Sequence, residues 1–335
     1  MGVRADAVAQ AFDAQLEPVA DVKAFEGFVA AGFDAKAPER RANLAMKAAM
    51  EALAQGRKVA MTGTRFYIDD AAPAGAATLT LPKVGVYRSY QASMEEGWMR
   101  YTLEQFSVPF TSIENRDVRA GNLRARFDTI ILPSQPADQI VNGHAAGTMP
   151  EPYVGGIGFE GVSALRAFVE AGGTLIAVDA AGLVPIRYFT IPVRDALEGV
   201  RNTEFYCPGS LLRMKIETAT PLTAGLPAEQ AAFFVNGRAF DFSAPGRGEG
   251  GDEAAATPRV PAGVTVLARY ADASTLLMSG WINGAARIGG KPAALDVAVG
   301  KGHVVLSGFG VNFRGQPQGT FKFLFNPILE ASKAR

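Results

Sequence analysis

The sequence predicts an α/β protein in which a flavodoxin-like parallel sheet is flanked by helices. From Lys83 onward, short β-branched runs alternate with amphipathic segments, which is the pattern of a parallel sheet covered on both faces. The chain has 335 residues, 48% of them hydrophobic, which is enough to bury a core of this kind. Four core strands are expected, within residues 83–90, 108–113, 128–133 and 174–179.

Two helices are expected among these strands. Ser93 and Glu96 have the S-x-x-E spacing of a capping box, which predicts a helix start. We expect four side chains of this helix to share a buried face: Met94, Trp98, Tyr101 and Phe106. The second helix lies within residues 162–172 and should end at Gly172 and Gly173.

The chain is expected to divide near Leu81, into a segment of helices and short strands (1–80) and an α/β domain (81–335). Residues 40–56 predict a helix that stops at Gly56. Its apolar positions at helical spacing are Leu44, Met46, Ala49, Met50 and Leu53. Residues 58–68 predict a strand or hairpin, and Pro and Gly make residues 69–82 a connector.

The part beyond Cys207 is expected to extend the sheet. Alternating runs at 211–218, 264–271 and 302–309 predict added strands, and residues 319–331 predict a closing helix. Residues 243–258 contain Gly, Ala and charged residues without apolar periodicity, which predicts an exposed mobile loop.

The charge composition argues against several kinds of partner. The 33 basic and 33 acidic residues balance, so no net field attracts nucleic acid or an anionic membrane. No run of 18 apolar residues occurs, and residues 1–15 lack the apolar segment of a signal peptide. We therefore expect no nucleic-acid or membrane partner, and the sequence leaves the localisation open.

Metal and disulfide chemistry are also disfavoured. The two histidines, His144 and His303, belong to no H-x-x-E or H-E-x-x-H pair, so no metal site is expected. Cys207 is the single cysteine, which excludes an internal disulfide. Its neighbours Phe205 and Tyr206 favour a small buried hydrophobe over a reactive thiol. No cofactor is expected.

A glycine motif raises the alternative of a dinucleotide site. Gly156, Gly158 and Gly161 have the order G-x-G-x-x-G, and Asp179 follows at the distance of a ribose-binding acid. The motif requires a strand that leads directly into it. Here the preceding strand ends near Pro133, and about twenty residues of loop intervene. We therefore expect a glycine-rich helix start, and a nucleotide-dependent oxidoreductase is the least favoured function.

The turn at Asp179 is where an α/β hydrolase or amidotransferase exposes a Ser or Cys nucleophile. This turn carries Asp179, Ala180 and Ala181, and the sequence contains no G-x-S-x-G or G-x-C-x-G. A carboxylate nucleophile needs a partner acid or base, and His303 precedes its strand instead of ending it. No catalytic residue is therefore expected.

Polar residues near the carboxyl ends of the parallel strands form the predicted pocket, because open α/β sheets gather their binding sites there. The candidates are Arg88, Ser89, Glu96, Trp98, Gln135, Asp179, Arg314 and Gln316. Each also has a structural interpretation, as a helix cap or an ion-pair partner. Binding of a small molecule or glycan in this pocket is an alternative function, as is an activity of the chain as a standalone enzyme.

Several stretches together resemble one protein family. Residues 84–113, 121–135, 155–179, 205–210 and 302–326 are similar to the C-terminal region of large bacterial zinc carboxypeptidase-like proteins. Residues 40–68 are similar to the segment that precedes that region, so the resemblance runs from about Ala42 to the end. It implies a class I glutamine amidotransferase-like domain, an upstream peptidase domain as partner, and a secreted or periplasmic parent protein.

Two departures limit what this resemblance implies. The H-x-x-E zinc ligands of the peptidase domain have no counterpart, and Asp179 occupies the elbow position where an amidotransferase has cysteine. Neither zinc hydrolysis nor glutamine hydrolysis is therefore implied, and we expect a noncatalytic accessory or binding module. If it supports a peptidase domain, part of the surface of residues 1–80 should be apolar.

Overall fold

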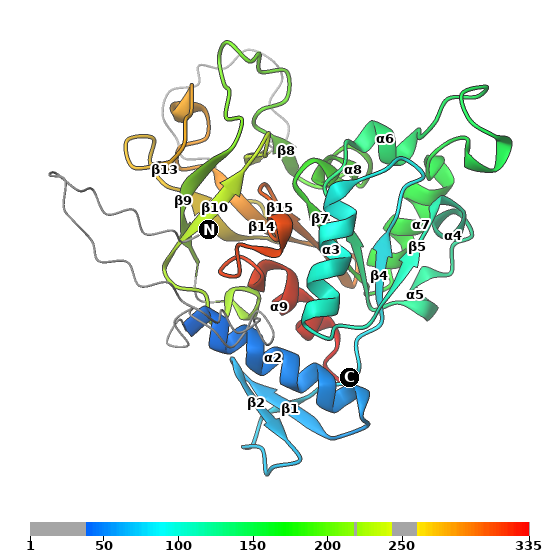
Figure 1. Ribbon diagram of the computed structural model, residues 1–335, viewed down its shortest axis with the longest axis vertical. Helices are drawn as coiled ribbons and strands as arrows, with labels where there is room; N and C mark the ends of the chain where they lie inside the picture. Colours follow the sequence, from blue (N-terminus) through cyan, green and yellow to red (C-terminus); the bar gives the residue numbers. More distant parts are fainter. Residues whose placement is uncertain (1–37, 218–219, 243–259, 335) are drawn as a thin grey trace, which may run out of the picture.

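The computed structural model describes residues 38–217, 220–242 and 260–334. Residues 1–37 of the predicted helical segment and the predicted loop at 243–258 lie outside these ranges. Most of the described chain forms one ten-stranded sheet with helices on both faces (Figure 1). The proposed boundary near Leu81 stays a prediction.

Five parallel strands form one half of this sheet, from the edge strand β5 inward, in the order β5-β4-β6-β7-β15. Numbered along the chain, the order is 2-1-3-4-5, which is the flavodoxin-like arrangement. The predicted fold class is therefore confirmed. The continuous apolar runs of the sequence are explained by β4, β6 and β7, which are buried along their whole length. The five strands are β4 (Val84–Tyr87), β5 (Phe110–Ile113), β6 (Thr129–Leu132), β7 (Thr174–Val178) and β15 (Gly302–Ser307).

Antiparallel strands extend the sheet beyond β15. They follow in the order β14, β12, β9 and β10, and β13 pairs with β9. These strands are β14 (Pro292–Val299), β12 (Val264–Tyr270), β9 (Ser210–Ile216), β10 (Glu229–Phe234) and β13 (Leu277–Ser279). The added strands predicted at 211–218 and 264–271 are confirmed. The run at 302–309 is instead β15, a core strand parallel to β7, because periodicity within one strand does not reveal the direction of its neighbour.

The helices cover the two faces of the sheet with separate apolar cores. One face carries α4 (Asn115–Arg119), α5 (Leu123–Arg126), α6 (Ala137–Val141), α7 (Gly158–Glu170) and α8 (Leu183–Tyr188). The other face carries α3 (Met94–Gln105) and α9 (Lys322–Ala331), as Figure 1 shows. The strands β8 (Val193–Asp195) and β11 (Phe240–Phe242) form a separate two-stranded ribbon, which is not paired with the strands of the large sheet.

The buried face of α3 differs from the predicted one. Met94 and Tyr101 are exposed, while Met99, Thr102 and Leu103 are buried. Phe106 is buried at the C-cap, as expected. The expected set is wrong because positions five apart, such as Tyr101 and Phe106, do not fall on one helix face, whereas 99, 102, 103 and 106 do.

The start of α3 forms one half of the predicted capping box. The Oγ of Ser93 accepts a 3.2 Å hydrogen bond from the backbone N of Glu96. The carboxylate of Glu96 does not return to the cap but pairs with Nε of Arg100 at 2.7 Å.

The N-terminal layer packs on α9, beneath the sheet in Figure 1. It consists of α2 (Pro38–Ala54) and a small sheet of β1 (Val59–Thr62), β2 (Arg65–Ile68) and β3 (Ala77–Thr78). The predicted helix and hairpin are confirmed, and Gly56, with φ of +76°, follows the helix end. The chain end closes this layer, because the backbone N of Ala334 bonds to the carbonyl of Thr78 and that of Thr80 bonds to Ser332.

Within the described part of residues 1–80, the expected apolar patch is not found, and residues 1–41 leave the rest of this expectation untested. In residues 42–80, no large hydrophobic side chain is exposed; all of those exposed in the described ranges lie at Leu81 or beyond. The apolar side chains of α2 and the hairpin, such as Met46, Met50 and Met61, face the core instead. Within the described ranges, no helix combines the length and apolarity needed to cross a membrane.

Candidate functional site

A strained turn follows β7 at the carboxyl end of the parallel strands. Asp179 begins a short 3-10 helix, η2 (Asp179–Gly182), which leads directly into α8. Its φ of +52° lies in the left-handed region, which non-glycine residues seldom adopt and which recurs at functional turns. The turn therefore has the sharp strand-to-helix form of a nucleophile elbow, the turn at which hydrolases and amidotransferases expose their nucleophile. The turn at Asp179 is called the elbow below.

The carboxyl group of Asp179 is buried at this turn. Asp179 is 8% exposed, and the Ser134 hydroxyl, just past β6, donates a 3.3 Å hydrogen bond to its Oδ2. Its Oδ1 has no hydrogen-bond partner among the described residues. Burial raises the pKa of Asp179 to about 8, against the opposing effects of the Arg238 charge and the Ser134 hydrogen bond. Asp179 is therefore mainly protonated at neutral pH.

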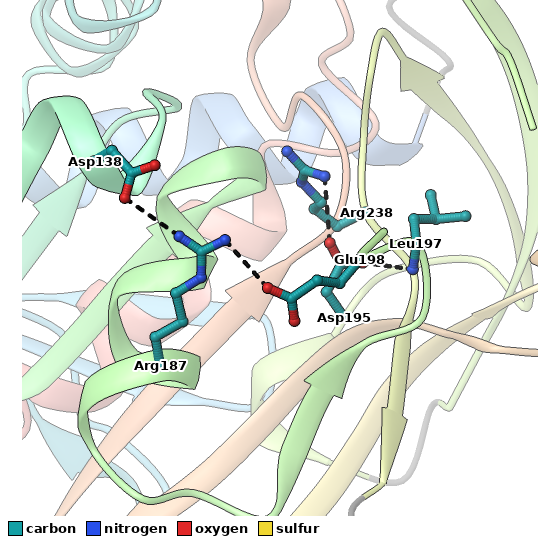
Figure 2. Close-up of polar contacts among 6 residues, drawn as sticks. All are labelled: Asp138, Arg187, Asp195, Leu197, Glu198 and Arg238. Atoms are coloured by element: carbon teal, nitrogen blue, oxygen red, sulfur yellow. Dashed lines mark hydrogen bonds and ion pairs between the residues drawn. The ribbon is translucent and has the colours of Figure 1, made fainter. Parts of the chain in front are cut away.

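Arg238 brings a positive charge to the same region. Its Nη1 donates a 3.2 Å hydrogen bond to Oδ2 of Asp195, whose side chain is 1% exposed (Figure 2). The other oxygen of Asp195 accepts a 2.9 Å hydrogen bond from the backbone N of Leu197. Burial nonetheless raises the pKa of Asp195. The negative charges of Glu95 and Asp195 also raise the pKa of Asp179.

The backbone holds Arg238 firmly against the end of β15. Its N donates a 2.7 Å hydrogen bond to the carbonyl of Gly308, and its own carbonyl accepts a 2.8 Å bond from the Tyr270 hydroxyl. A Cβ on Gly308 would lie 2.2 Å from the Arg238 carbonyl oxygen, and one on Gly237 would lie 2.5 Å from that of Gly308. Glycine is required at both positions because the two backbones touch.

A second, exposed network supports the helix that follows the turn. Arg187 of α8 donates to Oδ1 of Asp138 in α6 at 3.4 Å and to Oε1 of Glu198 at 3.2 Å (Figure 2). It therefore links α8 to α6 and to the segment after β8. These side chains are 36% to 73% exposed, so the network contributes little to stability.

The eight pocket residues expected from the sequence do not converge as one polar cluster. No hydrogen bond, ion pair or ring contact joins any two of them within the described ranges. Ser89 accepts from the backbone N of Gln91, Gln135 donates to Gln139, and Glu96 pairs with Arg100. Arg88 and Gln316 are exposed. Three of these side chains thus have local partners in turns and helices, and the pocket at the strand ends stays a prediction.

Trp98 and Arg314 do come together, through a third residue. The rings of Trp98 in α3 and Phe313 in η5 (Phe313–Gly315) meet edge to face, with centroids 4.8 Å apart. The Arg314 guanidinium lies 5.3 Å from the centre of the Phe313 ring, and Phe233 stacks on Phe313 at 4.0 Å. A half-buried aromatic surface thus joins α3, β10 and the segment after β15.

The glycine motif starts a helix, as expected. The chain between β6 and α7 contains α6 and a 3-10 helix, η1 (Glu151–Tyr153), so no strand leads into the motif. Gly158, with φ of +61°, begins α7. A Cβ on Gly156 would lie 2.3 Å from the carbonyl oxygen of Ile140, and one on Gly161 would lie 2.6 Å from Cβ of Ile157. Gly156 and Gly161 therefore allow close packing against Ile140 and Ile157, which a side chain at either position would prevent.

Neither the histidines nor the cysteine is hydrogen-bonded to Asp179 among the described residues, although Cys207 and Asp179 both raise the pKa of the buried Tyr270. His303 pairs with Asp296 through Nδ1 at 3.0 Å, which raises the pKa of the imidazole. Cys207 is buried, and burial raises the pKa of its thiol, which fits the predicted inert residue. In the described parts of the chain, no group of three or more His, Cys, Asp or Glu side chains could hold a metal ion.

The residues that surround Asp179 were missed by sequence reasoning. Ser134, Asp195, Arg238 and Tyr270 come from four separate segments. Only Ser134, next to the end of a predicted strand, carried a signal that could have identified it. The loop before β11 carries no such signal for Arg238. Its Asn236-Gly237 pair predicts a turn, but a turn does not determine the direction of the next side chain.

The chain matches no protein-family model and no curated protein. Its fold is similar to a β-galactosidase from Bacillus circulans sp. alkalophilus, at 12% identity over 76% of this chain and 31% of that one, with a TM-score of 0.44. A putative ThuA-like protein from Bacteroides uniformis is 13% identical over 77% of this chain and 94% of its own, with a TM-score of 0.41. A putative GMP synthase protein from Thermoplasma acidophilum is 10% identical over 74% of this chain and 92% of its own, with a TM-score of 0.44.

This chain therefore spans about a third of that β-galactosidase. These are likenesses of fold. The description that the structure itself supports is a flavodoxin-like α/β fold, and it rests on the strand order of the sheet.

Proposed function

We propose that this chain is a noncatalytic amidotransferase-like module that serves as an accessory or binding part of a zinc carboxypeptidase-like protein. The observation that carries the noncatalytic assignment is the residue at the elbow, an aspartate followed by two alanines in place of a Ser or Cys nucleophile. Asp179 stands there with a buried carboxyl group whose pKa is raised to about 8, so at neutral pH it is mainly neutral. A protonated carboxyl is neither a nucleophile nor a general base.

The surroundings of the elbow support the same assignment. Acyl transfer needs a base within hydrogen-bond reach of the nucleophile. The parallel register pairs His303 with Thr174 and Ser307 with Val178, so His303 lies four residues, about 13 Å, from the end of the strand. The backbone of His144 pairs with Val154 and Gly155 before α7, and its ring makes no hydrogen bond with a described residue. Neither histidine makes a hydrogen bond with Ser134 or Asp179 among the described residues, which supports the proposal.

Glutamine hydrolysis tests the noncatalytic assignment. The purified chain and its Asp179→Ala variant are incubated with L-glutamine, and glutamate release is measured from neutral to alkaline pH. We expect the wild-type chain to release glutamate no faster than the variant. A wild-type rate that Asp179→Ala abolishes would show that the elbow is catalytic.

The DNA upstream of the codon for Met1 tests the association with a peptidase. The association is inferred from the sequence resemblance, and an open reading frame that continues into an H-x-x-E motif is the expected result. An in-frame stop codon directly upstream would remove the link to a peptidase in the same chain. It would leave the noncatalytic assignment of the elbow untouched.

A small-ligand pocket is a second candidate function at the same edge of the sheet. It is favoured by the half-buried surface of Trp98, Phe313 and Arg314, which combines two aromatic rings with an exposed guanidinium. A thermal-shift screen of small carboxylates and sugars, repeated with Arg314→Ala, tests it. Hits that Arg314→Ala leaves unchanged would exclude this surface as their site.

A further inference from the structure

Two aromatic side chains are exposed together beside β13. Trp281 is 55% exposed and Tyr206 is 39% exposed, and their ring centroids lie 5.9 Å apart at an interplanar angle of 65°. Leu277 and Met278, on β13 itself, are also exposed. Figure 1 shows β13 at the edge of the molecule opposite α4 and β5. This aromatic surface therefore lies on the antiparallel extension, away from the parallel strands that carry the elbow.

The backbone beneath the two rings is fixed. The Ser210 hydroxyl accepts a 2.9 Å hydrogen bond from the backbone N of Trp281 and donates a 2.7 Å bond to its carbonyl. Tyr206 and Asn283 exchange two backbone hydrogen bonds, of 3.1 and 2.9 Å. Gly280, at φ of +97°, fits only because it has no Cβ, which would lie 2.5 Å from Oγ of Ser210. Rings held in this way lose little freedom when a ligand binds.

The charges beside the rings select against a cationic ligand. Glu204, two residues before Tyr206, is held between Arg201 at 3.1 Å and Arg287 at 2.7 Å, and this group, called the rim below, carries two positive charges for one negative. Aromatic faces attract cations, but this net positive rim opposes one. The same guanidinium groups can donate hydrogen bonds to hydroxyl groups, and Glu204 can accept them.

The size and composition of the surface favour a small ligand over a protein. A stable protein interface buries about 800 Å² on each partner, and charged residues are depleted at its centre. Here four apolar side chains are exposed, the ring pair with Leu277 and Met278, and the chain next to Tyr206 carries the charged Glu204 with its two arginine partners. A ligand that fits has apolar faces for the rings and a polar edge for the charged groups.

We propose that Trp281 and Tyr206 form a platform that binds the sugar rings of a neutral carbohydrate. The C–H faces of a pyranose pack on the exposed indole face, and its hydroxyl groups reach Glu204 and Arg287 at the rim. The platform uses none of the residues of the elbow, so it is independent of the noncatalytic role proposed above. Both can operate in one chain.

Affinity electrophoresis of the full chain tests the platform. Native gels each contain one soluble neutral polysaccharide: hydroxyethyl cellulose, xylan, galactan or galactomannan. We expect at least one to retard the chain, with affinity reduced about tenfold or more in Trp281→Ala and also reduced in Tyr206→Ala. Phe159→Ala is the matched control, because Phe159 is an exposed aromatic residue on α7, 73% exposed, and its removal should leave retardation unchanged.

Three outcomes would overturn the proposal. The first is no retardation in any of these gels, and the second is equal retardation of wild type and Trp281→Ala. The third is concentration-dependent self-association, measured by light scattering, that Trp281→Ala removes, since it would assign the surface to a second copy of the chain. Unchanged thermal unfolding of both variants confirms that they fold, as expected for exposed side chains.

Discussion

Arg238 and Asp195 form an ion pair in which the aspartate is buried and the arginine half-buried, with Nη1 of the arginine 3.2 Å from Oδ2 of the aspartate. Asp195 ends β8 and Arg238 lies two residues before β11, so the pair lies at one end of the ribbon that these strands form. The Arg238 charge also lowers the pKa of Asp179 at the end of β7. One guanidinium therefore pairs with Asp195 of the ribbon and lowers the pKa of Asp179 at the end of the core strand β7. This interaction links the elbow electrostatically to a part of the chain outside the parallel core.

Removal of this arginine should destabilise the protein strongly. Arg238→Met leaves Asp195 buried without its cation, which costs on the order of 3 kcal/mol in the free energy of unfolding. Urea unfolding at neutral pH measures the loss. Arg187→Met, at an exposed arginine with two ion pairs, is the matched control and should cost less than about 1 kcal/mol. Equal losses in the two variants would contradict the buried role of Arg238.

The carboxyl of Asp179 should make stability fall as the pH rises. Its pKa in the folded protein, about 8, lies above the ordinary value of 3.8, so the folded state keeps a proton that the unfolded state releases. Between pH 3.8 and pH 8, the free energy of unfolding of the wild type falls by on the order of 1.4 kcal/mol per pH unit, relative to a chain that has no ionisable group at position 179. Above pH 8 this decrease stops, because both states have then released the proton. Asp179→Asn, which cannot ionise, should therefore gain stability over the wild type as the pH rises from about 5 to about 8.

Urea unfolding of both proteins at several pH values in that range measures this gain. Asp138→Asn, at a carboxyl whose side chain is 73% exposed, is the control, and it should differ from the wild type by less than about 1 kcal/mol. Parallel profiles for Asp179→Asn and the wild type would show that Asp179 is ionised in the folded state at neutral pH.

The parallel core could be predicted from the sequence because its strands are buried on both faces. That burial demands continuous apolar runs, and β4, β6 and β7 show them plainly. The strand-to-helix turn at Asp179 was also predictable, since it follows such a run directly. The role of β15 was not, because its alternating pattern fits either neighbour direction.

The surroundings of the elbow could not be predicted for a different reason. Arg238 lies 59 residues beyond Asp179 in the sequence and reaches the site only because the antiparallel extension folds back on β15 at Gly308. Local patterns carry no information on such a contact. The same limit explains why the buried face of α3 was predicted wrongly. Apolar residues occur on two faces of this helix, and packing against the rest of the protein determines that Met99 and Leu103 are the buried ones.

The glycine at position 156 should resist substitution for reasons of packing alone. Gly156→Ala would place its Cβ 2.3 Å from a backbone oxygen, so the chain must shift, at a cost of about 1–3 kcal/mol. Gly97→Ala is the opposite control, since Gly97 lies within α3 with nothing within 4 Å of the new Cβ. It should stabilise the protein by about 0.5–1 kcal/mol. Thermal or urea unfolding measures both, and a stable Gly156→Ala variant would contradict the close approach.

Nicotinamide dinucleotides should leave the melting temperature unchanged. A pyrophosphate site needs free space and open N–H groups at the start of the helix, but Gly156 packs on the carbonyl of Ile140. The carboxylate of Glu160 also lies in the first turn of α7, where it repels an anion. A ligand at about a hundred times its dissociation constant would add about 2.7 kcal/mol of stability, a shift that thermal unfolding detects readily. A shift with NAD that Gly156→Ala or Asp179→Asn removes would instead establish the dinucleotide site and displace the noncatalytic assignment.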